Sequence, residues 1–575
     1  MAPTSSRTTL KLFIPVSILI FSTIFFLSGH HHSAHNITPP TPKTLLTRQH
    51  YSTSDLLPAT AARRHCDGTL YPDLCFSTLL SIPNLAGKTL PSIISSAVNT
   101  TVDSVVSSSR NCSSFLHRRL DPRQRLAVLD CIELLDATLD DLRLAVTDLR
   151  RSSSRRCRAD LSTVLSAAIT NQYTCLDGFA FVAEGQSIRP QIQRRILKIS
   201  RHVSNALAMS KKIASPESCK GGGEDEVFDV KGEFPAWLSP RDQRLLQDVA
   251  VAPAPAPGGI VADLVVAKDG SGNYTTVGDA VAAAPNNSAT RFVIYIKAGG
   301  YFENVEVGKN KINLMFVGDG MGKTVIKASR NVIDGWTTFR SATVAVVGNG
   351  FIARDLTVEN AAGTAKHQAV ALRCGADFSA FYRCSFVGYQ DTLYVHSLRQ
   401  FYRDCDIYGT VDFIFGDAAV VFQNCNLYAR KPDPNQKNIF TAQGREDPNQ
   451  NTGISIQRCK LEAAADLIPV LSEFQSYLGR PWKKYSRTVV MQSNLGALIQ
   501  PAGWLEWNGS FALDTLFYGE YMNRGLGSNT GGRVTWPGYR VFNSSSEAVN
   551  FTVANFIEGD QWLGAYAIPF SSGLN

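Results

Sequence analysis

The sequence lacks the patterns on which several large classes of protein depend. Only 18% of its 575 residues are charged, against 44% that are hydrophobic, which argues against wholesale disorder and a coiled coil. It has no C-x2-C pair, and its histidine cluster, His30–His32 with His35, stands beside the N-terminal apolar segment, where we interpret it as linker. A zinc site is therefore not expected. There is no G-x-S-x-G motif, and only His367 and His396 lie beyond residue 250, so a serine-histidine triad has little support.

An excess of one charge is also missing from most of the chain. Residues 251–575 contain 28 basic and 27 acidic residues, whereas residues 1–250 contain 29 and 22. Nearly all of the net charge of +8 therefore belongs to the N-terminal part, and a nucleic-acid partner for the whole molecule is not indicated.

No acidic residue precedes Asp55, and an apolar run from Leu12 to Leu27 follows Arg7 and Lys11. This pattern predicts a secretory signal peptide or a retained signal anchor within residues 1–30, and membrane contact only through such an anchor. Either alternative places the chain in the secretory pathway, where its twelve cysteines are expected to be largely paired. Eight N-x-S/T glycosylation sequons agree with this compartment: Asn36, Asn99, Asn111, Asn273, Asn286, Asn508, Asn543 and Asn550.

The chain then divides into two unlike parts. Residues 31–62 are rich in Thr, Pro and Ser and are expected to form a spacer, whereas apolar residues recur every three or four positions within 63–219, which predicts a helical bundle. A linker follows at 220–259, and its Arg244-Leu245-Leu246 segment is a candidate processing site, the alternative being a solvated charged linker. From residue 260 to 575 the sequence has short β-type runs punctuated by Gly and Asn.

A repeat runs through this C-terminal part. A large apolar residue, two further positions, Cys, one position and an apolar residue recur around Cys384, Cys405, Cys425 and Cys459, with spacings of 21, 20 and 34. A period near 20 predicts a parallel β-solenoid with one coil per repeat. Stacked coils place equivalent Cα atoms ~4.8 Å apart, within the range that a disulfide allows.

The same period indicates a candidate site. Asp391 and Asp412 are 21 residues apart, and Gln368 lies 22 residues before Gln390, so we expect all four on neighbouring coils. Two carboxylates this close cannot both ionise freely, which yields an acid beside a nucleophile or base, and glutamine amides can donate to an oxyanion. The alternative is a polar ladder that only satisfies turns between coils.

These residues resemble a known family, the plant pectin methylesterases made with an N-terminal inhibitor-like pro region. The resemblance covers nearly all of the chain from about Cys66 onward. In the C-terminal part it rests on five motifs, which are Gly299–Glu303, Gln368–Leu372, Gly388–Tyr394, Asp412–Gly416 and Leu478–Trp482. In the N-terminal part it rests on Cys66-x8-Cys75, Cys131 and Thr170–Gly178.

The resemblance implies a right-handed parallel β-helix that hydrolyses methyl esters of polygalacturonate, preceded by a four-helix bundle that keeps the precursor inactive. Asp412 would be the nucleophile, Asp391 the acid and base, and Gln390 with Gln368 the oxyanion donors. Arg480 would hold Asp412 and bind substrate, Trp482 would stack on a sugar, and Thr338 and Tyr394 would contact substrate. Phe415 would line the groove or belong to the core. No metal or cofactor is implied.

The family also implies disulfides and partners. Cys66–Cys75 and Cys131–Cys175 match its pattern, whereas the bridge that some relatives make from Cys384 is impossible here because Thr357 occupies the partner position. From the stacking of coils we expect Cys384–Cys405 and Cys425–Cys459, with Cys374–Cys384 as the alternative, and the pairing of Cys112, Cys157 and Cys219 stays open. The implied partners are methyl-esterified pectin, inhibitor-type proteins and a subtilisin-like processing protease, and the implied location is the extracellular cell wall.

Two other functions are compatible with a solenoid that follows a bundle. One is a pectin lyase or polygalacturonase, which would cleave the polysaccharide chain instead of an ester. The other is a non-enzymatic wall-binding or inhibitor protein.

Overall fold

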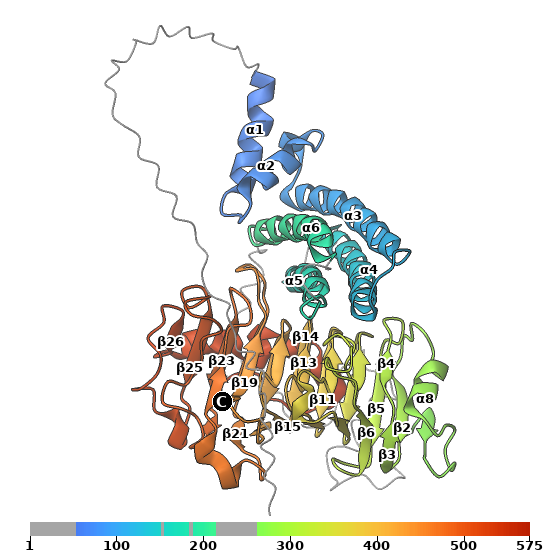
Figure 1. Cartoon of the computed structure of the whole chain (residues 1–575). Coiled ribbons are helices and arrows are strands. Elements are labelled where there is room, and N and C mark those ends of the chain that lie inside the picture. Colours follow the sequence, from blue (N-terminus) through green and yellow to red (C-terminus); the bar gives the residue numbers. More distant parts are fainter. Residues whose placement is uncertain (1–52, 151–154, 183–187, 214–260, 575) are drawn as a thin grey trace, which may run out of the picture. The chain divides into compact units, whose positions relative to one another are not determined.

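The computed structural model describes residues 53–150, 155–182, 188–213 and 261–574 (Figure 1). The N-terminal apolar segment, Asn36, the Arg244–Leu246 segment, Cys219 and the side chain of Cys157 lie outside this description. None of the helices within the described ranges combines the length and apolar character needed to cross a bilayer.

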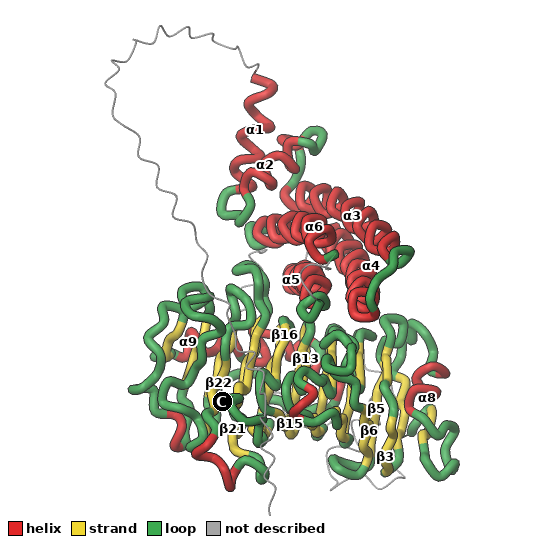
Figure 2. Tube along the Cα trace, in the orientation of Figure 1, coloured by secondary structure: helices red, strands yellow, loops and turns green. Residues whose placement is uncertain are grey.

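The described residues of the N-terminal part form six α-helices. Figure 2 shows them in red. They are α1 (Thr53–Cys66), α2 (Pro72–Leu80), α3 (Leu90–Phe115), α4 (Pro122–Arg150), α5 (Arg155–Asp177) and α6 (Arg189–Ser210). The expected spacer extended to residue 62, but α1 already begins at Thr53, because Leu56-Leu57 and the alanines that follow favour helix. Helices α3 to α6 form the expected four-helix bundle, and their apolar faces enclose buried residues such as Ile94, Leu135 and Leu207.

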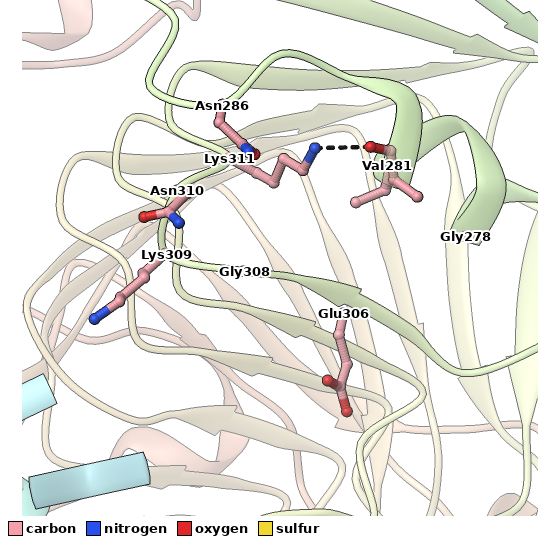
Figure 3. Close-up of a pocket in the computed structure, with 9 residues that line it drawn as sticks. Gly278, Val281, Asn286, Glu306, Gly308, Lys309, Asn310 and Lys311 are labelled. Carbon is pink, nitrogen blue, oxygen red and sulfur yellow. Dashed lines mark hydrogen bonds between the residues drawn. The ribbon is translucent and has the colours of Figure 1, made fainter. Parts of the chain in front are cut away.

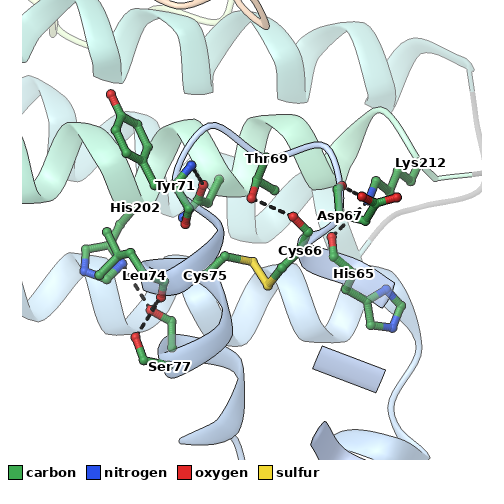
Figure 4. The surroundings of a disulfide bond; sticks show 12 residues. His65, Cys66, Asp67, Thr69, Tyr71, Leu74, Cys75, Ser77, His202 and Lys212 are labelled. Carbon is green, nitrogen blue, oxygen red and sulfur yellow. Dashed lines mark hydrogen bonds between the residues drawn. A yellow bond between two sulfur atoms is a disulfide. The ribbon is translucent and has the colours of Figure 1, made fainter. Parts of the chain in front are cut away.

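Two disulfides fix this part, and both are the pairs that the family pattern implies. Cys66–Cys75 joins α1 to α2, and the Thr69 hydroxyl donates to the carbonyl of Cys66 beside it (Figure 4). Cys131–Cys175 joins α4 to the last turn of α5. The second bridge therefore holds the C-terminal end of α5 against α4.

Three parallel sheets form the C-terminal part, and the chain passes from the first to the second and third in each coil. The first sheet contains β1 (Leu264–Val266), β2 (Phe292–Ile296), β5 (Leu314–Gly318), β8 (Ile352–Arg354), β11 (Ser379–Tyr382), β14 (Arg399–Arg403), β17 (Ala419–Gln423), β20 (Gly453–Gln457), β23 (Arg487–Met491), β25 (Phe517–Tyr521) and β26 (Tyr539–Val541). The second contains β3 (Gly299–Phe302), β6 (Thr324–Ala328), β9 (Thr357–Asn360), β12 (Ser385–Val387), β15 (Asp406–Gly409), β18 (Asn426–Ala429), β21 (Lys460–Ala463) and β24 (Asn494–Leu495). The third contains β4 (Val305–Val307), β7 (Val344–Val346), β10 (Leu372–Cys374), β13 (Leu393–Val395), β16 (Ile414–Gly416), β19 (Asn438–Gln443) and β22 (Ser476–Gly479). This is the parallel β-helix that the sequence predicts.

The way residues pair between neighbouring strands of the first sheet explains the sequence repeat around the four template cysteines. Phe381, Tyr402, Phe422 and Ile456, the large apolar residues of the template, pair in register on β11, β14, β17 and β20. The rings of Phe381 and Tyr402 stack at 4.6 Å, and those of Tyr402 and Phe422 at 4.7 Å. Each repeat therefore contributes one layer to a continuous core.

The four template cysteines do not form the expected disulfides. Cys384, Cys405, Cys425 and Cys459 are free and buried in the structure, and Cys374 is free as well. Each template cysteine follows a residue with positive φ at the corner between the first and second sheets, at Arg383, Asp404, Asn424 and Arg458. Equivalent Cβ atoms of stacked parallel coils point the same way and stay about 4.8 Å apart, whereas a disulfide needs about 3.5–4.5 Å. The stacked thiols instead pack as small core residues.

Short helices complete the fold. They are α8 (Val277–Ala283), α9 (Ser545–Ala548) and α10 (Val553–Phe556), with 3-10 turns at Leu85–Gly87, Thr364–Lys366, Ile468–Glu473, Leu526–Ser528, Val549–Phe551, Gly559–Gln561 and Leu563–Tyr566. Helix α8 packs Val277 and Val281 onto the first coils and so covers the open end of the core. The C-terminal segment packs Val553, Ile557 and Leu563 on the outer face of the first sheet.

Candidate active site

Two aspartates precede neighbouring strands of the third sheet. Asp391 and Asp412 each lie two residues before the first residue of β13 and β16, and these first residues, Leu393 and Ile414, pair in register. The 21-residue register inferred from the sequence is therefore correct. Both aspartates have positive φ, 60° and 51°, a conformation that is costly for a non-glycine residue and that is concentrated at functional sites.

Arg480 binds Asp412 in the bidentate arrangement that best fits a guanidinium to a carboxylate. Its Nε and Nη2 donate to the two oxygens of Asp412 at 2.8 and 2.6 Å. Arg480 follows β22, two strands beyond β16 in the third sheet, and its guanidinium lies 4.4 Å from the ring centre of Trp507. The Asp412 carboxylate is thus held in one orientation.

The environments of the two carboxyls differ. Burial raises the pKa of Asp391 well above its usual range, and the charge of Asp412 raises it further, while Arg480 opposes this shift. Burial also raises the pKa of Asp412, but here Arg480 opposes the shift with both its charge and its hydrogen bonds. The pair therefore favours a protonated Asp391 beside an ionised Asp412.

The two glutamines precede neighbouring strands, but they are not in exact register. Leu372 of β10 pairs with Leu393 of β13, a spacing of 21 that places Gln368 one position away from Gln390, at the level of Tyr389. The spacing of 22 read from the sequence therefore overstated their alignment, because the bend before β10 contains one residue more. The side-chain oxygen of Gln368 is buried and has no hydrogen-bond partner among the described residues.

Aromatic rings lie on the outer side of the third sheet. Tyr394 and Phe415 pair in register and stack at 4.2 Å, and Trp482 meets Phe415 edge-on at 5.9 Å. Phe415 packs with these outer rings and not with the solenoid interior, which resolves the choice between groove and core in favour of the outer face. Trp482 can approach the sheet because Gly444 has no Cβ, which would lie 2.8 Å from the indole ring.

Several residues beside these rings were not predicted from the sequence to belong to the site. Arg373 of β10 pairs in register with Tyr394, and Phe339 lies over it, 3.5 Å from the guanidinium carbon to the ring centre. The period of 21 between Arg373 and Tyr394 was the signal that could have found Arg373. Thr338 lines a small hollow with Trp336, Thr337 and Asp177 of the helical part.

The helical part contacts this face at several points. Asp177 at the end of α5 accepts a hydrogen bond from Lys483 at 2.8 Å, next to Trp482. The Thr174 hydroxyl lies 3.0 Å from Nε2 of His396, a ring that burial keeps neutral by lowering its pKa to about 3. Tyr394, Phe415 and Trp482 belong to the same apolar cluster as the bundle residues.

A second hollow lies at the N-terminal end of the solenoid, with a volume of about 370 Å³. Lys309, Asn310, Glu306 and the sequon residue Asn286 line it, and Lys311 donates to the carbonyl of Ala282 at its edge (Figure 3). No group of three or more His, Cys, Asp or Glu side chains suited to a metal ion occurs within the described ranges.

Comparison with known proteins gives two family matches and many relatives. The pectinesterase family model matches residues 263–560, and the plant invertase/pectin methylesterase inhibitor model matches residues 60–209. Pectinesterase 1 of Citrus sinensis is 51% identical over 522 residues, which cover 88% of each chain. Pectinesterase/pectinesterase inhibitor U1 of Solanum lycopersicum is 49% identical over 528 residues, also 88% of each chain.

A solved structure, pectin methylesterase from carrot, is 63% identical with a TM-score of 0.54. The match covers 55% of the present chain and 99% of the carrot chain. The solved carrot chain therefore corresponds to little more than half of the present chain.

Proposed function

This chain belongs to the pectinesterase family, and from this premise we propose that it demethylates pectin through Asp412 as nucleophile and Asp391 as acid and base. The bidentate Arg480–Asp412 pair, beside a buried Asp391 on the next coil, is the observation that supports these roles most directly. Family membership sets aside the lyase, polygalacturonase and non-enzymatic alternatives.

In the first step the ionised Asp412 attacks the ester carbonyl carbon of a methyl-galacturonate residue. The oxyanion of the tetrahedral intermediate accepts hydrogen bonds from the side-chain amides of Gln390 and Gln368. Asp391 then gives its proton to the departing methoxy oxygen, which leaves as methanol, and an acyl-enzyme on Asp412 remains.

In the second step Asp391, now ionised, takes a proton from water while the water oxygen attacks the acyl carbon. Collapse of the second intermediate breaks its bond to Asp412 and releases galacturonic acid, which loses its proton to the solvent and becomes the carboxylate. Asp391 is protonated again and Asp412 is free. Trp482 and Tyr394 supply ring faces for the sugar, and Thr338 contacts it at the edge of the groove.

The test is methanol release from methyl-esterified pectin. Asp412→Ala is expected to abolish it, whereas Asp406→Asn on β15 of the second sheet should leave it unchanged, since Asp406 accepts a hydrogen bond from Asn426 away from the third sheet. Full activity of Asp412→Ala would overturn the assignment. New reducing ends or unsaturated products would indicate chain cleavage instead of ester hydrolysis.

We infer that the bundle keeps the precursor inactive by covering the outer face of the third sheet. The contacts of Asp177 with Lys483 and of Thr174 with His396, and the shared apolar cluster with Tyr394 and Trp482, support this role. Asp391 and Asp412 are only 8% and 6% exposed. Full-length protein should release methanol only after the chain is cut within 220–259, and equal rates before and after cutting would contradict inhibition.

The location of the chain, its processing, its inhibitor partners and its glycosylation belong to the same proposal. The chain would be secreted to the cell wall, cut near Arg244–Leu246 by a subtilisin-like protease, and recognised by separate inhibitor-type proteins. Six sequons are exposed, namely Asn99, Asn273, Asn286, Asn508, Asn543 and Asn550, whereas Asn111 is half-buried. Mass spectrometry of the secreted protein, for its N-terminus and its glycopeptides, tests these points together.

A further inference from the structure

The last helix of the bundle, α6, contains basic residues but no aspartate or glutamate. Four of its arginine and lysine side chains are exposed and follow one another at helical spacing, so they lie on one face of the helix. These four, which we call the α6 stripe, are Arg194, Arg195, Lys198 and Arg201. The opposite face of α6 is apolar and buried in the bundle core. The helix therefore presents an unbroken row of positive charge to its surroundings.

The α6 stripe has no ionic partner in the described part of the chain. The structure gives its side chains one contact there, a cation–π contact of Arg201 with the ring of Tyr71 at 5.3 Å. Like charges three or four residues apart on a helix destabilise it by about 0.2–0.5 kcal/mol per pair. A ligand with several negative charges would relieve this repulsion.

The acidic side chains of the bundle already have partners on the solenoid. Asp130, Asp140 and Asp177 form ion pairs at 2.5, 2.7 and 2.8 Å with arginine or lysine side chains of the solenoid. In every ion pair between the two parts that the described residues form, the acid comes from the bundle and the base from the solenoid. The bundle thus uses its acids for docking and leaves the basic stripe of α6 free.

The shape and charge of the stripe favour a linear polyanion. Arg194 and Arg201 are seven residues apart, so the stripe extends about 10 Å along the helix axis. Three of its four side chains are arginines, and a guanidinium binds a carboxylate through two parallel hydrogen bonds. The solenoid contributes no comparable attraction, since residues 251–575 contain 28 basic and 27 acidic residues. Any strong attraction of the uncut chain to a polyanion would therefore come from the bundle.

We propose that the α6 stripe binds a run of ionised galacturonates in demethylated pectin. The choice of this polyanion rests on the proposed function, because ester hydrolysis converts a neutral chain into a row of carboxylates. The bundle then has two binding faces, one for the solenoid and one for the product of the reaction. The uncut chain should be held where the wall already carries free carboxylates, and the bundle should stay there after it is cut from the solenoid.

The experiment measures the Kd of the uncut full-length chain for polygalacturonate by isothermal titration calorimetry, in calcium-free buffer at neutral pH. Polygalacturonate carries no ester, so its binding does not depend on catalysis. Replacing all four stripe residues by glutamine is expected to raise Kd about tenfold, since each exposed ion pair contributes well below 1 kcal/mol. Raising the salt concentration from about 0.05 to about 0.3 M should weaken binding by the wild type and affect the variant less.

Two further variants separate the position of the charge from its amount and from packing. A control removes the same number of exposed charges from the solenoid, by replacing Lys323, Lys431, Lys460 and Arg524 with glutamine, and should keep the wild-type Kd. Changing the three stripe arginines to lysine keeps the charge and should retain most of the binding. The uncharged polysaccharide dextran should not bind.

The outcomes separate this proposal from the proposed function. An unchanged Kd in the stripe variant, an equal loss in the solenoid control, or binding that is insensitive to salt would overturn the polyanion site. Stripe-dependent binding to phosphatidylserine vesicles without binding to polygalacturonate would overturn the choice of ligand. In each of these cases methanol release by the cut protein would be unaffected, whereas methanol release by Asp412→Ala would overturn the mechanism and leave polygalacturonate binding intact.

Discussion

Arg480 donates to both carboxylate oxygens of Asp412, at 2.8 and 2.6 Å, while the neighbouring Asp391 receives only the charge of this arginine. In the proposed mechanism, this asymmetry is what separates two residues of identical chemistry into a nucleophile and an acid. It also makes Arg480 the residue on which the division of roles depends.

Arg480→Lys keeps the charge and loses the bidentate geometry. We expect kcat/KM for methanol release to fall about 100-fold, because a single ammonium cannot fix both oxygens and because a strong charged hydrogen bond is lost. Arg540 lies over the ring of Phe517 on the first sheet. The variant Arg540→Lys is therefore the matched control and should retain activity. A fall of less than threefold in Arg480→Lys would contradict the positioning role.

Gly444→Ala tests the packing of Trp482. The added Cβ would lie 2.8 Å from the indole, so the ring must move away from the sheet, and we expect KM for pectin to rise several-fold. Gly564→Ala introduces the same methyl group into open space and should change neither KM nor the melting temperature. An unchanged KM in Gly444→Ala would mean that the position of Trp482 does not affect substrate binding.

Glu446 links pH to the stability of the full-length chain. Burial raises its pKa to about 7 from a usual value of 4.5, and Lys483 only partly opposes this shift. Because the folded state binds the proton more tightly, the stabilisation is present below pH 4.5 and is lost as the pH rises through 7, by about 3 kcal/mol.

Glu446→Gln should flatten this part of the profile of unfolding free energy against pH, as measured by denaturant unfolding. Glu462→Gln on β21 serves as the control and should keep the wild-type slope. A Glu446→Gln profile that falls as steeply as the wild type would show that another group is responsible.

The Cys131–Cys175 disulfide holds the end of α5, and with it Thr174 and Asp177, against α4. Replacing both cysteines by alanine is expected to cost the bundle about 4 kcal/mol for a 44-residue separation, on the loop-entropy model. We therefore expect methanol release by the uncut chain to increase. Removing Cys66–Cys75, with a separation of 9, should cost about 2.6 kcal/mol and raise the activity of the uncut chain less. Equal activation by the two double variants would argue against a specific role for the end of α5.

Much of the architecture could be predicted because one spacing repeats. The period that relates Phe381, Tyr402 and Phe422 is the length of a coil, and the same period brings Asp391 level with Asp412. The prediction was less accurate where the chain leaves the strands. One additional residue before β10 shifts Gln368 out of line, and at the corners the spacing gives the separation of Cα atoms but not the directions of the cysteine side chains.

Arg373 was missed for a different reason. In the sequence it is one arginine after an apolar run, Val370 to Leu372, and nothing local distinguishes it from an arginine at the surface. Its environment depends on burial beneath Phe339 and on an ion pair of 3.9 Å with Glu133, and both partners lie far away in the chain. The spacing of residues along the sequence can place a residue at a position on a sheet, but it cannot show which of its hydrogen-bond donors have an acceptor.

Asp391 and Asp412, the two carboxylates of the proposed mechanism, stand on consecutive coils, so backbone hydrogen bonds between parallel strands set the distance between them. That distance is the spacing of neighbouring parallel strands. It is the same from one pair of coils to the next, and it does not depend on any single contact in the core. Substitutions that loosen the interior should reduce the melting temperature long before they change the separation of Asp391 and Asp412. A whole coil inserted between β13 and β16 would instead double that separation and leave a well-folded protein that cannot react.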